Sequence, residues 1–133
     1  MVVRSFSRQD HPTLRALGVE PCLGDLGDPQ AVSRAVAGCD VVFHVAAKPG
    51  IWGPYEEYHR ANVTGTENLL RACAGLPSPP KVALASSSNV YGIHPGIVSE
   101  EVLPLPVSDY GRSKLAMESV DLLIMGEIGR AHV

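Results

Sequence analysis

The stretch DVVFHVAA, from Asp40 to Ala47, decides the fold class. It is a short, nearly uninterrupted apolar run, which is typical of a strand buried on both faces of a sheet. The preceding stretch, DPQAVSRAVAG, has the signals of a helix: Asp28 is the predicted N-cap, Pro29 takes the first helical position and Gly38 ends it. Its apolar stripe is expected at Ala31, Val32, Ala35 and Val36. A buried strand that follows an amphipathic helix indicates an α/β protein.

The same alternation extends to both sides of that stretch. Further strands are predicted at Val2 to Ser7, Val19 to Asp25 and Lys81 to Ser87, and further helices at Thr13 to Gly18, at Pro54 to Gly75 and from Ser108 onward. Pro21 removes a ladder donor from the second strand, which therefore belongs near a sheet edge. The pattern predicts an open α/β fold with a parallel sheet and right-handed crossovers.

Composition excludes several classes of protein. The 133 residues suit one domain with an ordinary core, and a net charge of −3 without a long basic cluster argues against nucleic acid or an anionic membrane surface as partner. No apolar run approaches the roughly 20 residues that cross a bilayer, so membrane insertion is not expected. Cys22, Cys39 and Cys73 lack C-x-x-C spacing, which predicts reduced thiols in a cytoplasmic protein.

Candidate ligand-binding residues follow the predicted strands, because ligands bind beyond the carboxyl ends of a parallel sheet. Small residues at these ends would let a flat cofactor approach the backbone, Asp25 offers a carboxylate, and the serines offer hydroxyl groups. The residues at the four strand ends are Ser7 and Arg8; Gly24, Asp25 and Leu26; Ala46, Ala47 and Lys48; and Ser86, Ser87 and Ser88.

A tyrosine and a lysine stand four positions apart in DYGRSK, where the last predicted helix begins. Leu115, Ser119 and Leu122 to Leu123 continue at near-helical spacing, so Tyr110 and Lys114 share one helix face and can serve one ligand. The alternative is an exposed pair on a solvated helix. The hydroxyl-bearing strand ends favour the first interpretation.

Five motifs, in this order and spacing, resemble the extended short-chain dehydrogenase/reductases, the NAD-dependent epimerase/dehydratase family, from Val2 to about Met125. They are GDLGDP (Gly24 to Pro29), DVVFHVAA, NVTGTENLL (Asn62 to Leu70), SSSNVYG (Ser86 to Gly92) and YGRSK (Tyr110 to Lys114). The stretch FHVAAKPGIWGPYEEYHRANVTGT most resembles the 3β-hydroxysteroid dehydrogenase-like branch. The resemblance implies a partial Rossmann-like doubly wound parallel sheet.

The resemblance also implies a catalytic set. Tyr110 would take or give the proton of a substrate hydroxyl, and because a free phenol ionises only near pH 10, Lys114 and the nicotinamide ring would have to favour the phenolate. Lys114 also matches the family residue that hydrogen-bonds the nicotinamide ribose. Ser87 matches the serine that hydrogen-bonds the substrate oxygen, with Ser88 as the rival if the register slips by one.

Cofactor contacts follow from the same comparison. Asp25 and Leu26 match the pair that flanks the adenine ring, and Ala46 and Ala47 match the backbone that lines the cofactor. Arg8 stands where an arginine accommodates a 2′-phosphate, with no acid before Asp10, so NADP or NAD is expected and Arg8 favours NADP. The histidines show no ligand spacing, and no metal is predicted.

The expected function is that of an NAD(P)-dependent oxidoreductase of the short-chain type. It would act on a secondary alcohol or ketone in a small-molecule substrate, 3-hydroxysteroid-like or another bulky 3-hydroxy compound, and the full-length protein would be a homodimer. One alternative is a nucleotide-sugar epimerase or dehydratase, a close cousin in the family. The other, of a different class, is a non-catalytic dinucleotide-sensing or scaffold protein.

The family's opening strand with its G-x-x-G-x-x-G turn has no counterpart in this sequence, nor has its C-terminal substrate region. We therefore expect residues 1–125 to be a partial NAD(P)-binding domain, inactive by itself, whose first and third predicted strands lack a shared neighbour. Residues 126–133 are expected to be a non-native tail, because EIGRAHV back-translates into what looks like a sequencing adapter.

Overall fold

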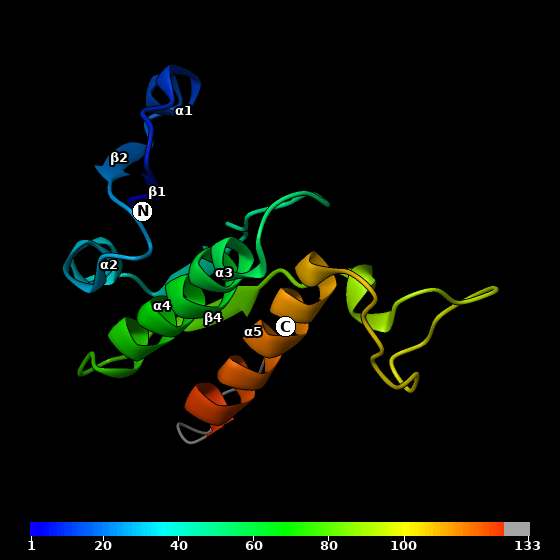
Figure 1. Ribbon diagram of the computed structural model, residues 1–133. Coiled ribbons are helices and arrows are strands. Elements are labelled where there is room, and N and C mark those ends of the chain that lie inside the picture. Colours follow the sequence, from blue (N-terminus) through cyan, green and yellow to red (C-terminus); the bar gives the residue numbers. More distant parts are fainter. Residues whose placement is uncertain (127–133) are drawn as a thin grey trace.

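The computed structural model describes residues 1–126, in which strands alternate with helices (Figure 1). The elements are β1 (Arg4–Ser7), α1 (Pro12–Ala16), β2 (Glu20–Leu23), α2 (Pro29–Val36), β3 (Val41–His44), α3 (Tyr55–Tyr58), the π-helix η1 (His59–Thr64), α4 (Gly65–Ala74), β4 (Lys81–Leu84), the 3-10 helix η2 (Ser88–Tyr91) and α5 (Asp109–Gly126). The predicted α/β class is confirmed. Of the predicted tail, Gly126 ends α5, and residues 127–133 lie outside the described residues.

The strands form two separate parallel ladders. β1 pairs with β2, so that Phe6 lies beside Cys22, and β3 pairs with β4, so that Phe43 lies beside Ala83. Within residues 1–126 no strand joins β1 to β3, which agrees with the expectation that these two strands lack a shared neighbour. In each two-stranded ladder, the outer edge of both strands therefore has backbone groups without a ladder partner.

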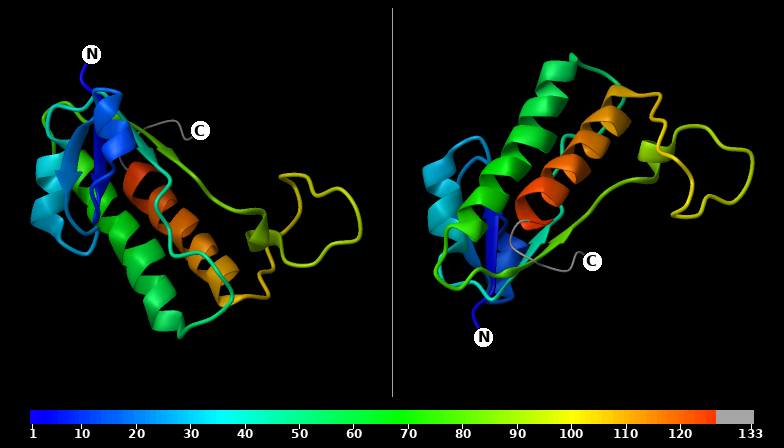
Figure 2. Two further views of the ribbon diagram at one scale, coloured as in Figure 1. Left: turned by 90° about the horizontal axis from the view of Figure 1, so that it is seen from above. Right: turned by 90° about the horizontal axis from the view of Figure 1, so that it is seen from below.

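A layer of helices holds the two ladders together. α2 packs against α4, and α4 packs against α5; Figure 2 shows α4 and α5 side by side. Asp28 caps α2 as predicted, because its Oδ1 accepts hydrogen bonds from the backbone N–H groups of Gln30 and Ala31. The predicted stripe of α2 is confirmed as buried. The core consists of Val32, Val36, Leu69, Leu70, Cys73, Val82 and Met125, with Ala31 and Ala35 also buried.

The prediction that β3 is buried on both faces is wrong. His44 is buried and Val42 packs against the core, but Phe43 is 76% exposed and Val41 and Val45 are also exposed. Successive side chains of a strand point to opposite faces, so one face of β3 meets the helical layer while the other faces outward. An apolar run indicates that a strand can be buried, but among the described elements only one face of β3 is packed against other residues.

The near-helical spacing after Lys114 correctly predicts the helix α5. Its buried residues include Lys114, Met117 and Met125, whereas Leu122 and Leu123 are exposed. The helix thus packs on α4 and η1 through a face that carries polar residues. The predicted start is confirmed, because Ser108 Oγ accepts a hydrogen bond from the backbone N–H of Gly111.

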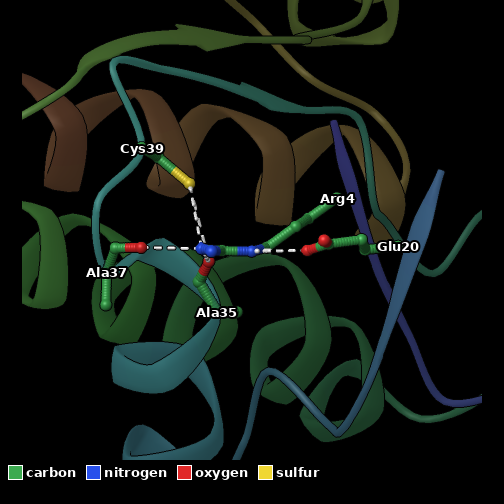
Figure 3. Close-up of polar contacts among 5 residues, drawn as sticks. All are labelled: Arg4, Glu20, Ala35, Ala37 and Cys39. Carbon is green, nitrogen blue, oxygen red and sulfur yellow. Dashed lines mark hydrogen bonds and ion pairs between the residues drawn. The ribbon is translucent and has the colours of Figure 1, made fainter. Parts of the chain in front are cut away.

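One arginine attaches β1 to its surroundings (Figure 3). Arg4 Nη1 donates to the backbone oxygen of Ala37 at 2.6 Å and to that of Ala35 at 3.5 Å, and its Nε donates to Glu20 Oε2 at 3.4 Å. Its Nη1 also lies 4.0 Å from Cys39 Sγ. The carbonyl groups at a helix C-terminus lack intrahelical donors, so this guanidinium satisfies the end of α2 and links it to the β1–β2 ladder.

The segment between η2 and α5 extends away from the helices in every view (Figures 1 and 2). It exposes Ile93, Ile97, Leu103 and Leu105. Among residues 1–126 no helix is long and apolar enough to cross a bilayer.

Candidate functional site

A cleft of about 580 Å³ lies beyond the carboxyl ends of β1, β2 and β3. All five residues that were predicted to contact the cofactor at these strand ends line it: Arg8, Asp25, Leu26, Ala46 and Ala47. The sequence thus correctly predicted that these segments meet. Their role in binding a dinucleotide stays a prediction.

The wall after β2 is built by two close approaches. A Cβ on Gly24 would lie 2.6 Å from a ring atom of Phe6, so only glycine lets the loop after β2 pack against β1. Asp25 Oδ1 accepts a hydrogen bond from the backbone N–H of Gly27 at 2.7 Å, which closes a turn at the rim. Asp25 Oδ2 lies 4.0 Å from Arg8 Nε, an exposed pair.

Charged residues other than the five predicted cofactor contacts also line the cleft. Lys48 Nζ forms an ion pair with Glu57 Oε2 at 2.9 Å and lies 5.3 Å from the centre of the Tyr58 ring. The hydrogen bond that Lys48 donates to the Glu57 carboxylate raises the pKa of Lys48. Arg60 contributes a further cation to the lining. Arg60 belongs to the π-helix η1, and its position on that helix cannot be read from a regular 3.6-residue period.

Asn62 connects the cleft to α5. Its Oδ1 accepts from the backbone N–H of Lys48 at 2.7 Å, and its Nδ2 donates to Lys48 O at 3.2 Å and to Ser113 Oγ at 2.9 Å. Ser113 Oγ in turn donates to the backbone oxygen of Tyr110. One buried amide therefore ties the loop after β3 to the turn of α5 that carries Tyr110 and Lys114.

Ser87 lies at the start of η2 with its hydroxyl oriented by one neighbour. Its Oγ accepts hydrogen bonds from the backbone N–H and from the side-chain Nδ2 of Asn89, both at 3.2 Å. A hydroxyl oxygen has two acceptor lone pairs and one proton to donate. Because both lone pairs are used, the Ser87 proton is left to donate to a ligand.

The first turn of α5 packs directly on η2. A Cβ on Gly111 would lie 2.5 Å from the backbone oxygen of Asn89, so the glycine of YGRSK permits the contact. This contact places the first turn of α5, which includes Tyr110, against η2, the helix that Ser87 precedes. The hydroxyl of Tyr110 makes no hydrogen bond within the described part of the chain.

Lys114 is buried, with 3% of its surface exposed. Its Nζ donates to the backbone oxygen of Ala85 at 2.5 Å and lies 3.3 Å from Met117 Sδ. Burial lowers the pKa of Lys114, and the carboxylate of Glu118 acts in the opposite direction. Burial, and to a lesser extent the positive charge of Lys114, lowers the pKa of the nearby His44 to about 4.

The eight predicted site residues therefore fall into two groups. Five line the cleft, while Tyr110, Lys114 and Ser87 lie on α5 and η2, outside its lining but joined to it through Asn62. The sequence did not predict the contributions of Asn89 or Glu118. Within residues 1–126 there is no group of three potential metal ligands.

Comparison with known proteins adds the family. Residues 2–124 match the NAD dependent epimerase/dehydratase family. The chain belongs to that family. Its members include enzymes of the short-chain dehydrogenase/reductase type, and the Rossmann-like α/β fold predicted from the sequence agrees with the solved structures of relatives.

Three relatives illustrate the range of activities. A 2-alkyl-3-oxoalkanoate reductase from Stenotrophomonas maltophilia is 55% identical over 53% of this chain and 22% of its own length. A 3-beta-hydroxysteroid dehydrogenase from Mycolicibacterium neoaurum is 34% identical over 96% of this chain and 37% of its own length. A crystal structure of UDP-glucuronic acid 4-epimerase from Bacillus cereus, with UDP-glucuronic acid and NAD, is 28% identical and covers 99% of this chain and 46% of that chain, with a TM-score of 0.85.

This chain thus spans between about a fifth and a half of the length of these relatives. They differ in the reaction that they are named for, although NAD is bound in the solved epimerase. The comparisons therefore show the family of this chain, residues 2–124 matching the NAD dependent epimerase/dehydratase family. The relatives include a reductase and an epimerase as well as a 3-beta-hydroxysteroid dehydrogenase, so they share the family and not one branch of it.

Proposed function

We propose that these residues form the nucleotide-binding part of an NAD(P)-dependent oxidoreductase that acts on a secondary alcohol or ketone at the 3-position of a bulky substrate. Two relatives are named for such groups, a 3-oxoalkanoate in one and a 3-hydroxysteroid in the other. Because the chain spans only part of their length, the activity is proposed for the whole protein that carries these residues.

The contact between Gly111 and the backbone oxygen of Asn89 is the observation that supports this proposal most. It packs the first turn of α5 on η2, so that a phenol, an ammonium and a hydroxyl come from adjoining segments. A reaction that adds or removes hydrogen at an alcohol carbon needs a group that exchanges the hydroxyl proton and a donor that holds the oxygen. Tyr110 would exchange the proton, and Ser87 would hold the oxygen.

The orientation of Ser87 supports a defined direction for its hydrogen bond. Asn89 occupies both acceptor positions of the Ser87 hydroxyl, so Ser87 would donate to the substrate oxygen. The proton of a substrate alcohol would then pass to Tyr110 alone. Lys114 would carry positive charge beside this pair from its buried position.

The cleft residues fit the adenosine half of a dinucleotide. Ala46 and Ala47 have small side chains that would leave room for a flat ring at the strand ends, and Asp25 keeps one carboxylate oxygen clear of the Gly27 turn. When bound, the nicotinamide would supply the site that accepts or returns the hydride. Asp25 offsets the charge of Arg8, so the pair supports NAD as well as NADP, and we propose either cofactor.

The test uses the full-length protein with a bulky 3-oxo acid or a 3-ketosteroid and reduced cofactor. We expect Tyr110→Phe to lose on the order of 10²–10⁴-fold in turnover, because the phenyl ring cannot exchange the proton. Tyr55→Phe, at the start of α3, is the matched control and should keep its activity. Equal turnover in the two variants would contradict the assigned role of Tyr110.

A nucleotide-sugar epimerase is the second candidate, supported by the solved epimerase with its bound UDP-sugar and NAD. An epimerase returns the hydride to the same substrate, so it converts a UDP-sugar with no net consumption of cofactor. The two reactions are separated by following cofactor oxidation and sugar composition in parallel. A non-catalytic sensor would bind the dinucleotide without turnover of either substrate, and Tyr110→Phe would leave that binding unchanged.

Other predictions remain proposals at the level of the whole protein. We propose residues 1–125 as part of the NAD(P)-binding domain, a cytoplasmic location and a homodimer. The boundary at residue 126 is tested by sequencing the gene, where a coding sequence that continues with family-like residues would contradict a non-native tail.

A further inference from the structure

An acidic side chain that the proposed reaction does not use adjoins two of the proposed catalytic residues. Glu118 lies one helical turn beyond Lys114 on α5, so both side chains lie on the same face of the helix. Its Oε1 accepts a hydrogen bond from the hydroxyl of Ser86. Ser86 directly precedes Ser87, so Glu118 contacts the strand end that leads into η2.

Lys114 reaches the same strand end from the other direction. Its Nζ donates to the backbone oxygen of Ala85, the neighbour of Ser86. Two side chains of α5, one positive and one negative, therefore hold consecutive residues after β4. This pairing fixes the approach of the chain to Ser87 at two points.

The surroundings of Lys114 explain why a negative charge matters there. An ammonium group loses hydration when it is buried, which disfavours its charged form unless an opposite charge is close. His44 faces it from β3, but burial keeps the imidazole neutral near pH 7, since its pKa is about 4. Tyr110 lies one turn before it on α5. Asp121 is a second buried acid on α5, seven residues beyond Lys114. The carboxylate of Glu118, one turn away, favours the charged lysine.

We propose that Glu118 is a positioning residue of this active site, which anchors the end of β4 through Ser86 and keeps the buried Lys114 in its charged form. The proposal rests on the proposed function, because it gives Lys114 and Ser87 their catalytic meaning. Glu118 itself touches neither substrate nor cofactor in this assignment.

A simple structural role predicts a different result. If Glu118 only fastened α5 to β4, its removal would loosen the contact and let water reach Lys114. The pKa of Lys114 would then rise toward the ordinary value of a lysine. If Glu118 supplies the charge, its removal leaves the ammonium buried without compensation, and the pKa of Lys114 falls further.

Because the two roles predict shifts of opposite sign in the pKa of Lys114, a titration of that lysine distinguishes them. The chain contains three lysines, Lys48, Lys81 and Lys114. With ¹³C-labelled lysine, their three side-chain signals can be followed by NMR during a pH titration, and Lys48→Arg and Lys81→Arg assign them. In Glu118→Gln we expect the midpoint of Lys114 to fall below that of the unaltered chain. Glu101→Gln, in the exposed segment before α5, removes the same charge and should leave it unchanged.

A second variant covers the case in which Glu118→Gln does not fold. Ser86→Ala keeps the carboxylate but frees it from the strand end. We expect a smaller fall in the Lys114 midpoint and a chemical-shift change at the backbone amide of Asn89, which donates to Ser87 Oγ. A midpoint that stays or rises in Glu118→Gln overturns the proposal, and so does a Ser86→Ala variant in which neither signal moves.

These titrations require no substrate and no turnover. A failure of the proposed reaction would show as active Tyr110→Phe enzyme, whereas a failure of the Glu118 proposal would show in the lysine signals of the chain itself. The two outcomes are therefore distinguishable.

Discussion

The hydrogen bonds around His44 show which ring nitrogen carries a proton. The hydroxyl of Thr66 donates its one proton to the backbone oxygen of Asn62 at 2.7 Å, so it must accept from His44 Nε2, 2.8 Å away. The imidazole therefore carries a proton on Nε2, and its pKa of about 4 leaves the ring neutral near pH 7. Its burial, together with the nearby Lys114, explains the pKa of about 4.

This histidine predicts how stability depends on pH. The unfolded chain binds the proton near pH 6.5, whereas the folded chain binds it only near pH 4. Stability is therefore complete above pH 6.5 and is lost as the pH falls toward 4, by about 3 kcal/mol. Urea unfolding across this window measures the loss.

Substitution isolates the contribution of His44. His44→Gln keeps a donor for Thr66 and has no titrating ring, so its stability should vary less over the same window. His94→Gln, in the exposed segment after η2, should behave as the unaltered chain does. An equal pH dependence in His44→Gln and the unaltered chain would contradict the assignment.

At this scale the sequence predicted part of the site. Tyr110 and Lys114 are close in sequence, so their spacing on a helix is sufficient to place them on one face. Ser86 and Glu118, or His44 and Thr66, are brought together by the packing of different elements, and no local spacing reports such contacts. The side chains that orient the proposed catalytic residues were therefore not predicted.

The segment NVTGTENLL, at the end of η1 and the start of α4, contacts the loop after β2. Asn68 Nδ2 donates to the backbone oxygen of Leu26 at 2.8 Å, which fixes the rim of the cleft after β2. A Cβ on Gly65 would lie 2.9 Å from Leu26 Cβ, so the start of α4 must be glycine for this rim to pack. The polar and small residues of this motif thus serve contacts with the cleft.

Enlarging that glycine should disturb the rim. We expect Gly65→Ala to lower the free energy of unfolding by about 1–3 kcal/mol, because Leu26 Cβ lies at the base of a side chain and cannot move away alone. Gly75→Ala, at the end of α4, is the control, since the nearest atom to its Cβ would be Arg71 O at 3.4 Å. Urea unfolding of both variants gives the comparison, and equal stabilities would refute the proposed close packing.

Elements were predictable where their signals are local. α2 has a capping aspartate, a proline in its first turn and a regular apolar stripe, and all of these predictions are confirmed. α5 buries polar side chains that contact η1 and the residue after β4, Ser113 with Asn62 and Lys114 with Ala85, and no local spacing indicates these contacts. The long helix from Pro54 to Gly75 was predicted as one regular element, and its central π-helix, which carries Asn62, had no recognised sequence signal.

For the whole molecule, the outward face of β3 is the largest departure from the sequence prediction. Val41, Phe43 and Val45 alternate along one side of the strand and are all exposed. The apolar run correctly predicted a strand. Burial depends on which elements pack on each face, and the local sequence does not specify those elements. A contiguous apolar surface of this kind binds hydrophobic probes.

We expect the chain to bind the dye ANS through this face. Phe43→Ser removes the largest side chain of the set and should reduce ANS fluorescence. Ile97→Ser, on the segment that extends from the body, removes an exposed apolar side chain away from β3 and should change the fluorescence little. Equal reductions in the two variants would show that the face of β3 is not the binding surface.

The two ladders have a consequence for the cleft. Arg8 and Asp25 follow the β1–β2 ladder, whereas Ala46 and Ala47 follow β3, and no strand hydrogen bond joins these ladders within residues 1–126. The two sides of the cleft are held at their separation by the packing of α2 on α4 and by the Asn68 hydrogen bond to Leu26. A shift at these contacts would change the width of the opening while every backbone ladder stays intact. The width of the cleft therefore depends on contacts between helices and loops, and strand pairing does not fix it.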